Sequence, residues 1–322
     1  MKRLLSIVLA VVLSLSVCAC SKQKRQNEKL TIVTTVFAVY DFAREIGGDC
    51  IDAKLLLKPG AEAHSYEPTP QDIVSISESD VFIYVGGEND EWVEEILESV
   101  DTEGITCLKL MDCIDKKYAE EEVEGMEVHE HHEEEENPDE EHEEEHEEWD
   151  EHVWTSPVNA IAISSRMMDV FSRLDSKNAA VYKDNFNEYS EKLSHLDTQI
   201  REVISGSKRK EIIFGDRFPL RYFVEEYGLS YYAAFPGCAS NNEASAATIA
   251  FLVDKVREDE IPVVFKIELT NENMAKTIAE ENNAKILTFY SMHNISKDDY
   301  DNGESYYSLM NKNLESLKEA LN

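Results

Sequence analysis

The sequence predicts an α/β protein with two lobes, each built on a mostly parallel sheet flanked by helices. Strand-like and helix-like segments alternate along most of the 322 residues, and this alternation is typical of parallel sheets covered by helices. One long amphipathic segment with few helix breakers, residues 176–205, separates two such series. We expect this segment to be a single rigid helix that joins the lobes.

The first alternating series precedes a stretch rich in glutamate. Thr69 and Pro70 indicate a helix start, because Thr69 is a favourable N-cap, Pro70 suits the first helical position and Asp72 can reach back to the cap. The expected strands are Leu30–Val36, Lys54–Lys58, Val81–Val85 and Thr106–Met111, and the expected helices are Phe37–Ile46, one that begins at Pro70, and Asp90–Ser99.

The second series follows two helical segments, Pro157–Leu174 and the long joining helix. Its expected strands are Glu211–Asp216, Ser230–Phe235, Ile261–Glu268 and Lys285–Tyr290, and its expected helices are Pro219–Tyr227, Ser245–Glu258, Glu272–Glu281 and Tyr306–Leu321. We therefore expect an N-terminal lobe over residues 30–175, a linking helix over 176–206 and a C-terminal lobe over 207–322.

The first 29 residues predict export and a lipid anchor. Lys2 and Arg3 precede an apolar run that is too short to span a membrane and suits a signal peptide over residues 1–19. Ala19 before Cys20 resembles a bacterial lipobox, so we expect a lipid on Cys20 and a polar tether over residues 20–29. An ordinary signal peptide cut near Ala19 is the alternative. The lipid would hold the protein on the extracytoplasmic face of the cell membrane.

The segment 120–151 consists almost entirely of acidic residues and histidine. It contains 20 Asp and Glu residues, no Lys or Arg, and five histidines: His129, His131, His132, His142 and His146. Imidazole flanked by carboxylates attracts divalent transition metals. Because such a segment has few apolar groups, we expect a solvated loop that collects metal weakly.

The net charge argues against nucleic acid as a partner, and the cysteine content leaves the disulfide pairing open. The net charge of −35 divides into −20 from the acidic segment and −15 from the rest, so both parts repel nucleic acid. Four cysteines follow Cys20, namely Cys50, Cys107, Cys113 and Cys238. Export permits disulfides between them, with three full pairings possible, and free buried thiols are the equally open alternative.

The metal-ligating side chains gather at expected strand ends, where parallel α/β sheets bind ligands. His64, His152 and His293 follow or lie near such ends, whereas His195 lies within the long helix. Asp216 and Glu268 each end a strand. Each residue alone has an ordinary structural explanation, but together they predict a metal site in the interlobe cleft. Histidine with one carboxylate suits Zn²⁺, and the carboxylates keep Mn²⁺ possible.

Motifs for catalysis are missing from the sequence. It contains no H-E-x-x-H helix, G-x-S-x-G elbow, phosphate loop or G-x-G-x-x-G. A metallohydrolase also needs an open coordination position and a general base, and no motif marks either. We therefore expect a protein that binds metal without transforming a substrate.

Three segments resemble the metal-binding receptors of ABC importers, specifically the zinc and manganese group. Residues 59–68 (PGAEAHSYEP) resemble its first ligand loop, with His64 as the ligand. Residues 151–157 (EHVWTSP) resemble its second motif, of the type DPHVWLDP, with His152 as the ligand. Residues 222–229 (YFVEEYGL) resemble the helix after the third ligand, and a His-rich acidic loop before the second motif is typical of zinc-specific members.

The sequence departs from the family pattern at the third and fourth ligands. No histidine precedes the helix at 222–229, and the usual Asp near the end of the chain is replaced by the stretch that contains His293. Our hypothesis is that His293 supplies the missing imidazole and Asp216 an oxygen ligand. Arg217 stays protonated and is a poor ligand, so we expect it to pair with a carboxylate such as Glu268 beside the site.

The resemblance implies a lipid-anchored, monomeric zinc receptor that delivers its ion to an ABC permease and the ATPase that drives it. Three other functions remain open on the sequence. The same fold serves manganese or iron receptors, a surface adhesin or metal-storage protein would also bind metal, and a zinc-dependent hydrolase would show turnover that depends on His64.

Overall fold

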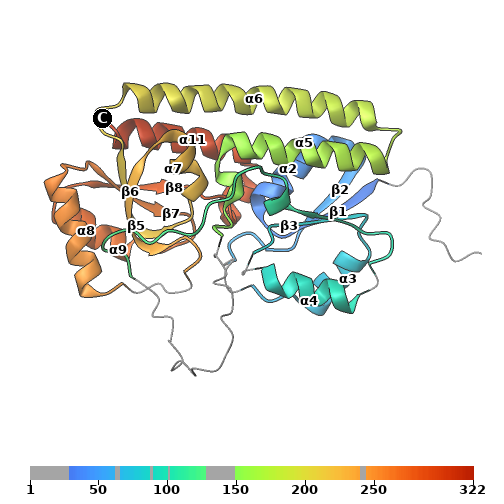
Figure 1. Cartoon of the computed structure of the whole chain (residues 1–322), viewed down its shortest axis with the longest axis horizontal. Helices are drawn as coiled ribbons and strands as arrows, with labels where there is room; N and C mark the ends of the chain where they lie inside the picture. The colour runs from blue at the N-terminus through green and yellow to red at the C-terminus, as the bar shows by residue number, and fades with distance from the viewer. Residues whose placement is uncertain (1–28, 62–65, 88–89, 101, 128–148, 240–243) are drawn as a thin grey trace, which may run out of the picture.

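The computed structural model describes residues 29–61, 66–87, 90–100, 102–127, 149–239 and 244–322. Within these ranges, eight strands form two four-stranded sheets, and every strand pair in both sheets is parallel. Figure 1 shows the two sheets at opposite ends of the molecule with helices around them. The prediction of a two-lobed α/β fold is confirmed.

The N-terminal sheet has the strand order β2-β1-β3-β4. Its strands are β1 (Leu30–Thr34), β2 (Ile51–Leu55), β3 (Val81–Tyr84) and β4 (Thr106–Lys109). The connecting helices are α2 (Phe37–Gly47), α3 (Pro70–Ser77) and α4 (Glu91–Ser99), and two short 3₁₀ turns lie at Gly48–Cys50 and Leu110–Asp112. The two central strands, β1 and β3, are mostly buried, as expected where helices cover both faces, whereas the edge strands β2 and β4 are only partly buried.

The second strand begins earlier than the sequence predicts. The apolar run Leu55–Leu57 indicates a strand over Lys54–Lys58, but β2 pairs with β1 over Ile51–Leu55. β2 lies at the edge of its sheet, where Asp52 stays exposed beside the buried Ile51. Leu56 and Leu57 are buried beyond the strand end, in the chain that leads toward the candidate site. The prediction from apolar content therefore starts this strand three residues too late.

The C-terminal sheet repeats the winding of the first, with the order β6-β5-β7-β8. Its strands are β5 (Glu211–Phe218), β6 (Ser230–Pro236), β7 (Val263–Ile267) and β8 (Lys285–Phe289), and its helices are α7 (Arg221–Tyr227), α8 (Ala246–Glu258) and α9 (Asn273–Glu280). In both sheets the first strand is flanked by the second and the third. On the two sides of this first strand, the connections between strands lead toward opposite edges of the sheet. Open parallel sheets bind ligands at such a position.

A layer of long helices lies across both sheets. α5 (Pro157–Leu174) matches its predicted bounds, and α6 (Ala179–Gly206) follows it. Figure 1 shows α6 running along one side of the whole molecule. It packs on α2 and α5 of the first half and on α7 and α11 (Tyr306–Ala320) of the second. The buried side chains of α6 repeat every three or four residues, as predicted, and one short helix, α10 (Lys297–Asp301), was not predicted.

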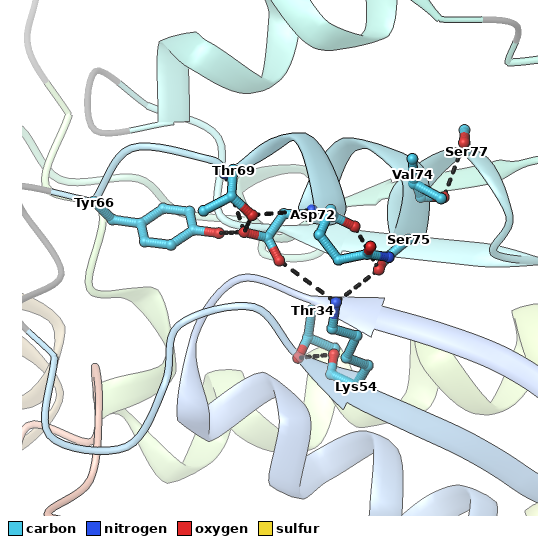
Figure 2. A network of polar contacts seen from close by, with 9 residues as sticks. Thr34, Lys54, Tyr66, Thr69, Asp72, Val74, Ser75 and Ser77 are labelled. Atoms are coloured by element: carbon cyan, nitrogen blue, oxygen red, sulfur yellow. Dashed lines mark hydrogen bonds and ion pairs between the residues drawn. The ribbon is translucent and has the colours of Figure 1, made fainter.

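The predicted capping of α3 is present and extends into a larger polar network. The Thr69 hydroxyl accepts from the Asp72 amide, and the Asp72 carboxylate accepts from the Thr69 amide at 3.1 Å. Figure 2 shows that the same carboxylate binds Lys54 of β2 and the Tyr66 hydroxyl, the latter at 3.0 Å. The network therefore ties the start of α3 both to the sheet and to Tyr66, which lies beside the candidate site.

The described parts of the acidic segment are partly packed against the rest of the protein. Trp149 pairs with Ala119 in an antiparallel bridge, and Met126 is buried. The Glu127 carboxylate accepts from Ser245 at the start of α8, an end of a helix where negative charge is stabilising. Residues 120–127 thus contact the C-terminal half, so this part of the segment is not the free solvated loop expected from the sequence. The five histidines of the segment lie outside the described residues.

Two other sequence-based expectations can be compared with the structure. All four cysteines after Cys20 are free thiols, so none of the disulfide pairings is formed; Cys107 is exposed and the other three are partly buried, whereas the free-thiol alternative expected buried thiols. The predicted signal peptide, Cys20 and nearly all of the tether lie outside the described residues. Within the described ranges, no helix has the length and apolar character needed to cross a bilayer.

Asp41 gives the fold a testable dependence on pH. It is buried in α2, and burial raises its pKa to about 7, although the Tyr306 amide of α11 donates to it at 2.8 Å and favours its charged form. The folded state therefore keeps a proton that the unfolded chain loses near pH 4. This group stabilises the fold less as pH rises from about 4 to 7.

We predict that Asp41→Asn removes this pH dependence, because an amide oxygen can still accept from Tyr306 and carries no charge. Urea unfolding of the chain from Ser21 to Asn322 and of the variant would be measured at pH 5 and pH 8. The stability of the variant relative to the parent should rise by about 2 kcal/mol between these values. If the stability difference between the variant and the parent is the same at pH 5 and pH 8, this pH dependence does not come from Asp41.

Candidate metal centre

His293 lies in a turn, Ser291–Ile295, that is fixed by the C-terminal sheet. Glu268 follows β7 and is buried, and its carboxylate accepts three hydrogen bonds of 2.7 Å from the Ser291 amide, the Ser291 hydroxyl and the Met292 amide. Burial raises the pKa of Glu268, while these hydrogen bonds oppose the rise. Met292 has a φ of 59°, a left-handed conformation that costs free energy for a residue with a side chain. The Glu268 carboxylate stabilises this conformation.

The same turn is also bound by the N-terminal half. The first two amides of α2 donate to it, Phe37 to the His293 carbonyl at 3.0 Å and Ala38 to the Met292 carbonyl at 3.1 Å. Helix N-termini have no intrahelical acceptors for these amides, so the turn satisfies them. The Trp154 indole donates to the Ser291 carbonyl at 2.8 Å. His293 is therefore positioned by both halves of the molecule.

His152 is fully buried beside His293. It precedes a 3₁₀ turn, Val153–Thr155, that leads into α5. Its Nδ1 lies 3.3 Å from Asp150 Oδ1, and the same oxygen accepts from the His152 amide at 2.8 Å. The ring centroids of His152 and His293 are 5.3 Å apart. A carboxylate bound to one imidazole nitrogen is typical of metal-ligating histidine, because it leaves the other nitrogen to the metal.

Electrostatics around His152 favour a positive charge. Burial by itself lowers the pKa of His152, but Asp150, Glu151 and Glu120 more than offset this effect, so the pKa lies above its ordinary value. The same negative field stabilises a bound cation. A proton and a metal ion would therefore compete for this imidazole.

The chain before His64 contacts the turn that carries His293. His64 itself lies outside the described residues. Before it, the Asn294 side chain donates to the carbonyls of Lys58 and Ala61 at 2.9 and 2.7 Å, and the Gly60 amide donates to the Ile295 carbonyl at 2.8 Å. After it, the Tyr66 hydroxyl donates to Asp72 (Figure 2), and the Tyr66 ring packs against Trp92 with ring centroids 5.6 Å apart.

A pocket lies beyond the carboxyl ends of the N-terminal strands, where the sequence placed the site. It is lined by the residues that follow β1, β2 and β3, by two aromatic side chains, by two carboxylates and by His293: Thr35, Val36, Leu57, Tyr66, Val85, Asp90, Trp92, Glu151 and His293. Its residues come from both halves of the chain. Among the described residues, no group of three or more metal-ligating side chains is already assembled.

Asp216 and Arg217 lie at the corresponding end of β5. The Asp216 carboxylate accepts from the amides of Arg217 and Ile267 at 2.8 and 3.1 Å and from the Thr270 hydroxyl. Burial raises the pKa of Asp216, and these donors oppose the rise. The Arg217 guanidinium donates to the Ala239 carbonyl at 3.1 Å. These contacts join β5 to the turn after β7, and neither residue lines the pocket described above.

Two pocket carboxylates, Asp90 and Glu151, were not singled out from the sequence. Asp90 precedes α4, and its Oδ2 accepts from the amides of Val85 and Gly86 at 2.7 and 3.0 Å. Glu151 was noted as the last residue of the acidic segment and as the first residue of the motif at 151–157, but not as a candidate ligand. Its position directly before His152 was a signal that the many neighbouring glutamates obscured.

The fold and the site define a class of protein, namely two-lobed α/β proteins with histidines at the junction of the lobes. The chain matches over residues 32–320 the family described as the periplasmic component A of the zinc-uptake complex. It belongs to this family, whose members are binding components of an uptake system rather than enzymes. The family prediction made from the sequence is confirmed.

Individual relatives agree with this membership. The zinc-binding lipoprotein AdcA of Streptococcus pneumoniae (strain ATCC BAA-255 / R6) is 32% identical over 320 residues, which are 98% of this chain and 60% of the relative. The high-affinity zinc uptake system protein ZnuA of Bacillus subtilis (strain 168) is 32% identical over 321 residues, 98% of this chain and 97% of the relative. This chain therefore spans about three fifths of the AdcA lipoprotein and nearly all of the Bacillus relative.

A solved structure shows the same architecture. The Zn(II)-bound ZnuA-like domain of Streptococcus pneumoniae AdcA superposes with a TM-score of 0.71 at 28% identity, over 91% of this chain and 99% of that one. The similarity covers both lobes and the helices between them. It places this chain with a domain that was crystallised with zinc.

We predict that Glu268→Gln destabilises the fold by about 2–4 kcal/mol, because an amide group must replace one of the acceptor oxygens that face three donors. Urea unfolding measures the loss. Glu280→Gln, an exposed change on α9, serves as the control and should shift stability by less than about 0.5 kcal/mol. Equal stabilities of the two variants would show that Glu268 does not hold the turn.

Proposed function

We propose that this protein captures Zn²⁺ outside the cytoplasm and delivers it to an ABC permease driven by a cytoplasmic ATPase. The observation that supports this most directly is the meeting of His152 and His293, whose ring centroids lie 5.3 Å apart although the two residues are 141 positions apart in the sequence. Two imidazoles at this distance, one of them oriented by a carboxylate, are suited to zinc. Binding without reaction agrees with the missing catalytic motifs.

His64 is proposed as the third imidazole ligand. Its segment begins at Ala61, which is bound by Asn294 next to His293, and ends at Tyr66, which lines the same pocket as His293. Four residues between two such anchors have a short reach, since an extended chain spans at most about 3.6 Å per residue. Asp216 stays a prediction as an oxygen ligand, although three donors already bind its carboxylate.

We propose that release of the ion involves only a small rearrangement. The turn Ser291–Ile295 receives hydrogen bonds from α2 and from Trp154, and α6 packs on helices of both halves. Wide opening would break these bonds and expose buried amides. Small shifts near Tyr66 and Trp92, at the edge of the pocket, would be sufficient for an ion to pass.

The lipid anchor and the acidic segment complete the proposal. Cys20 would carry the lipid, and a monomer held at the membrane would meet its permease there. The segment that contains His129, His131, His132, His142 and His146 would bind zinc weakly and raise its concentration near the pocket. Manganese is the competing cargo, and we expect it to bind more weakly because imidazole favours zinc.

Calorimetric titration tests the proposed site. The chain from Ser21 to Asn322, stripped of metal, should show one tight zinc site and weaker manganese binding. His152→Ala and His293→Ala should each lower the affinity of that site at least about a hundredfold. His195→Ala, an exposed change on α6, is the matched control and should leave it unchanged. If both site variants still bind zinc tightly, His152 and His293 are not ligands of the tight site.

Deletion of residues 129–147 tests the accessory role of the acidic segment. The deletion removes its five histidines but keeps residues 120–127, which pack on the C-terminal half, and Trp149, which pairs with Ala119. We predict loss of the weak zinc sites and retention of the tight one in the same titration. If the tight site disappears while the protein stays folded, the segment is part of the principal site.

A further inference from the structure

After β4 the chain crosses from the N-terminal half to the C-terminal half, and residues 118–127, the crossing segment, lie along the latter (Figure 1). The Glu120 carboxylate accepts from the Cys238 amide at 2.8 Å, and the Glu127 carboxylate accepts from the Ser245 amide at 2.9 Å. The crossing segment is therefore fixed to the C-terminal half, although it follows the last strand of the N-terminal sheet.

The chain that carries His152 is bound to the crossing segment. Trp149 pairs with Ala119, and the Asp150 amide donates to the Tyr118 carbonyl at 2.9 Å. Asp150 Oδ1 in turn accepts from the His152 amide at 2.8 Å and lies 3.3 Å from Nδ1 of the His152 ring. The direction of this ring therefore depends on the position of Asp150, and Asp150 lies against the crossing segment.

Tyr222 of α7 binds both chains where they meet. It is 2% exposed, and its hydroxyl donates to the Asp150 carbonyl at 3.0 Å and accepts from the Tyr118 amide at 3.4 Å. Burial raises the pKa of Tyr222, so the hydroxyl keeps its proton at neutral pH and can donate. The Tyr222 ring packs edge-on against the Tyr118 ring, with centroids 5.4 Å apart. One side chain thus fixes Asp150 relative to the crossing segment.

The turn after His152 makes a second, independent contact with the same helix. The 3₁₀ turn Val153–Thr155 packs on α7 and is buried, and α7 lies between β5 and β6 of the C-terminal sheet in the chain. His152 belongs to residues 30–175, which the sequence assigns to the N-terminal lobe. The residues on both sides of it are nevertheless held by a helix of the C-terminal half.

We infer that Tyr222 is a positioning residue for zinc binding, because its hydroxyl fixes Asp150, and Asp150 directs the His152 ring toward the ion. Partners that orient a metal-bound histidine change the metal affinity although they do not touch the metal. The alternative is that Tyr222 contributes only packing, in which case removal of its hydroxyl lowers stability and leaves zinc affinity unchanged. The inference rests on the proposed function, since it concerns a ligand of that same site.

The test compares Tyr222→Phe with the parent chain from Ser21 to Asn322. Phenylalanine keeps the buried ring and removes only the hydroxyl. Zinc affinity is measured by competition with a chromophoric chelator, and the coordination of bound Co²⁺ by its visible absorption. Tyr222→Phe should weaken zinc about tenfold and change the cobalt spectrum, which a loss of packing or of stability alone would leave unaltered.

Tyr182→Phe is the matched control. Tyr182 of α6 is also fully buried, and its hydroxyl donates to the Asp175 carboxylate at 2.9 Å, at the end of α5. Hydrogen bonds to charged groups contribute more to stability than those to carbonyls, so this variant should lower the urea midpoint at least as much as Tyr222→Phe. Its zinc affinity should stay within about twofold of the parent, with an unchanged cobalt spectrum.

Asp150→Ala completes a double-mutant cycle. Because Tyr222 acts through Asp150, each single variant should weaken zinc, but Tyr222→Phe should add less than about twofold in the Asp150→Ala background. Circular dichroism of each variant checks that it is folded.

The possible results separate the inference from the proposed function. If the parent binds zinc tightly, His293→Ala loses this binding and Tyr222→Phe keeps both the affinity and the cobalt spectrum, the inference is wrong and the proposed function stands. Equal losses of zinc affinity in Tyr222→Phe and Tyr182→Phe, or additive effects of Tyr222→Phe and Asp150→Ala, would also overturn the inference. If the parent shows no tight zinc site, the proposed function fails, and the inference fails with it.

Discussion

The turn Ser291–Ile295 joins the two halves of the molecule, and the candidate site depends on it. Glu268 binds its amides from the C-terminal sheet, while α2 and Trp154 bind its carbonyls from the other half. Asn294 and Ile295 extend the same contacts to the chain before His64. The strained conformation of Met292 is thereby stabilised, and the His293 ring is fixed beside that of His152. Preorganisation of this kind lowers the entropy that binding would otherwise cost.

Buried acids around this junction give the site its electrostatic character. Asp150, Glu151, Asp216 and Glu268 are each less than 10% exposed. Most of their oxygens accept backbone or hydroxyl hydrogen bonds, which stabilises the charged forms against the cost of burial. A divalent cation offsets that cost further, so ion binding and the stability of the junction are linked. The field that raises the pKa of His152 therefore also attracts the metal.

The sequence predicted the architecture well because the fold is repetitive and strongly patterned. Buried parallel strands read as short apolar runs, and α5 and α3 have clear start signals at Pro157 and Thr69. Edge strand β2 was misplaced because Leu56 and Leu57 are buried outside the strand. The boundary of the acidic segment was also misjudged, since composition alone does not show that the Glu127 carboxylate accepts from the Ser245 amide at the start of α8.

The site was only partly predictable, for a different physical reason. Histidines near strand ends indicated His152 and His293, and the structure brings their rings together. The contacts that fix them run between residues far apart in the chain, such as Trp154 and Ser291, and no local pattern encodes them. Glu151 was hidden among 19 other acidic residues of its segment, and only the pocket distinguishes it from them.

A zinc-edge anomalous diffraction map of crystals grown with one equivalent of zinc would show whether His152 and His293 bind the same ion. We expect one principal peak within coordination distance, roughly 2.0–2.2 Å, of an imidazole nitrogen of His152 and one of His293. A principal peak away from both rings, with His152 and His293 free of metal, would contradict this expectation.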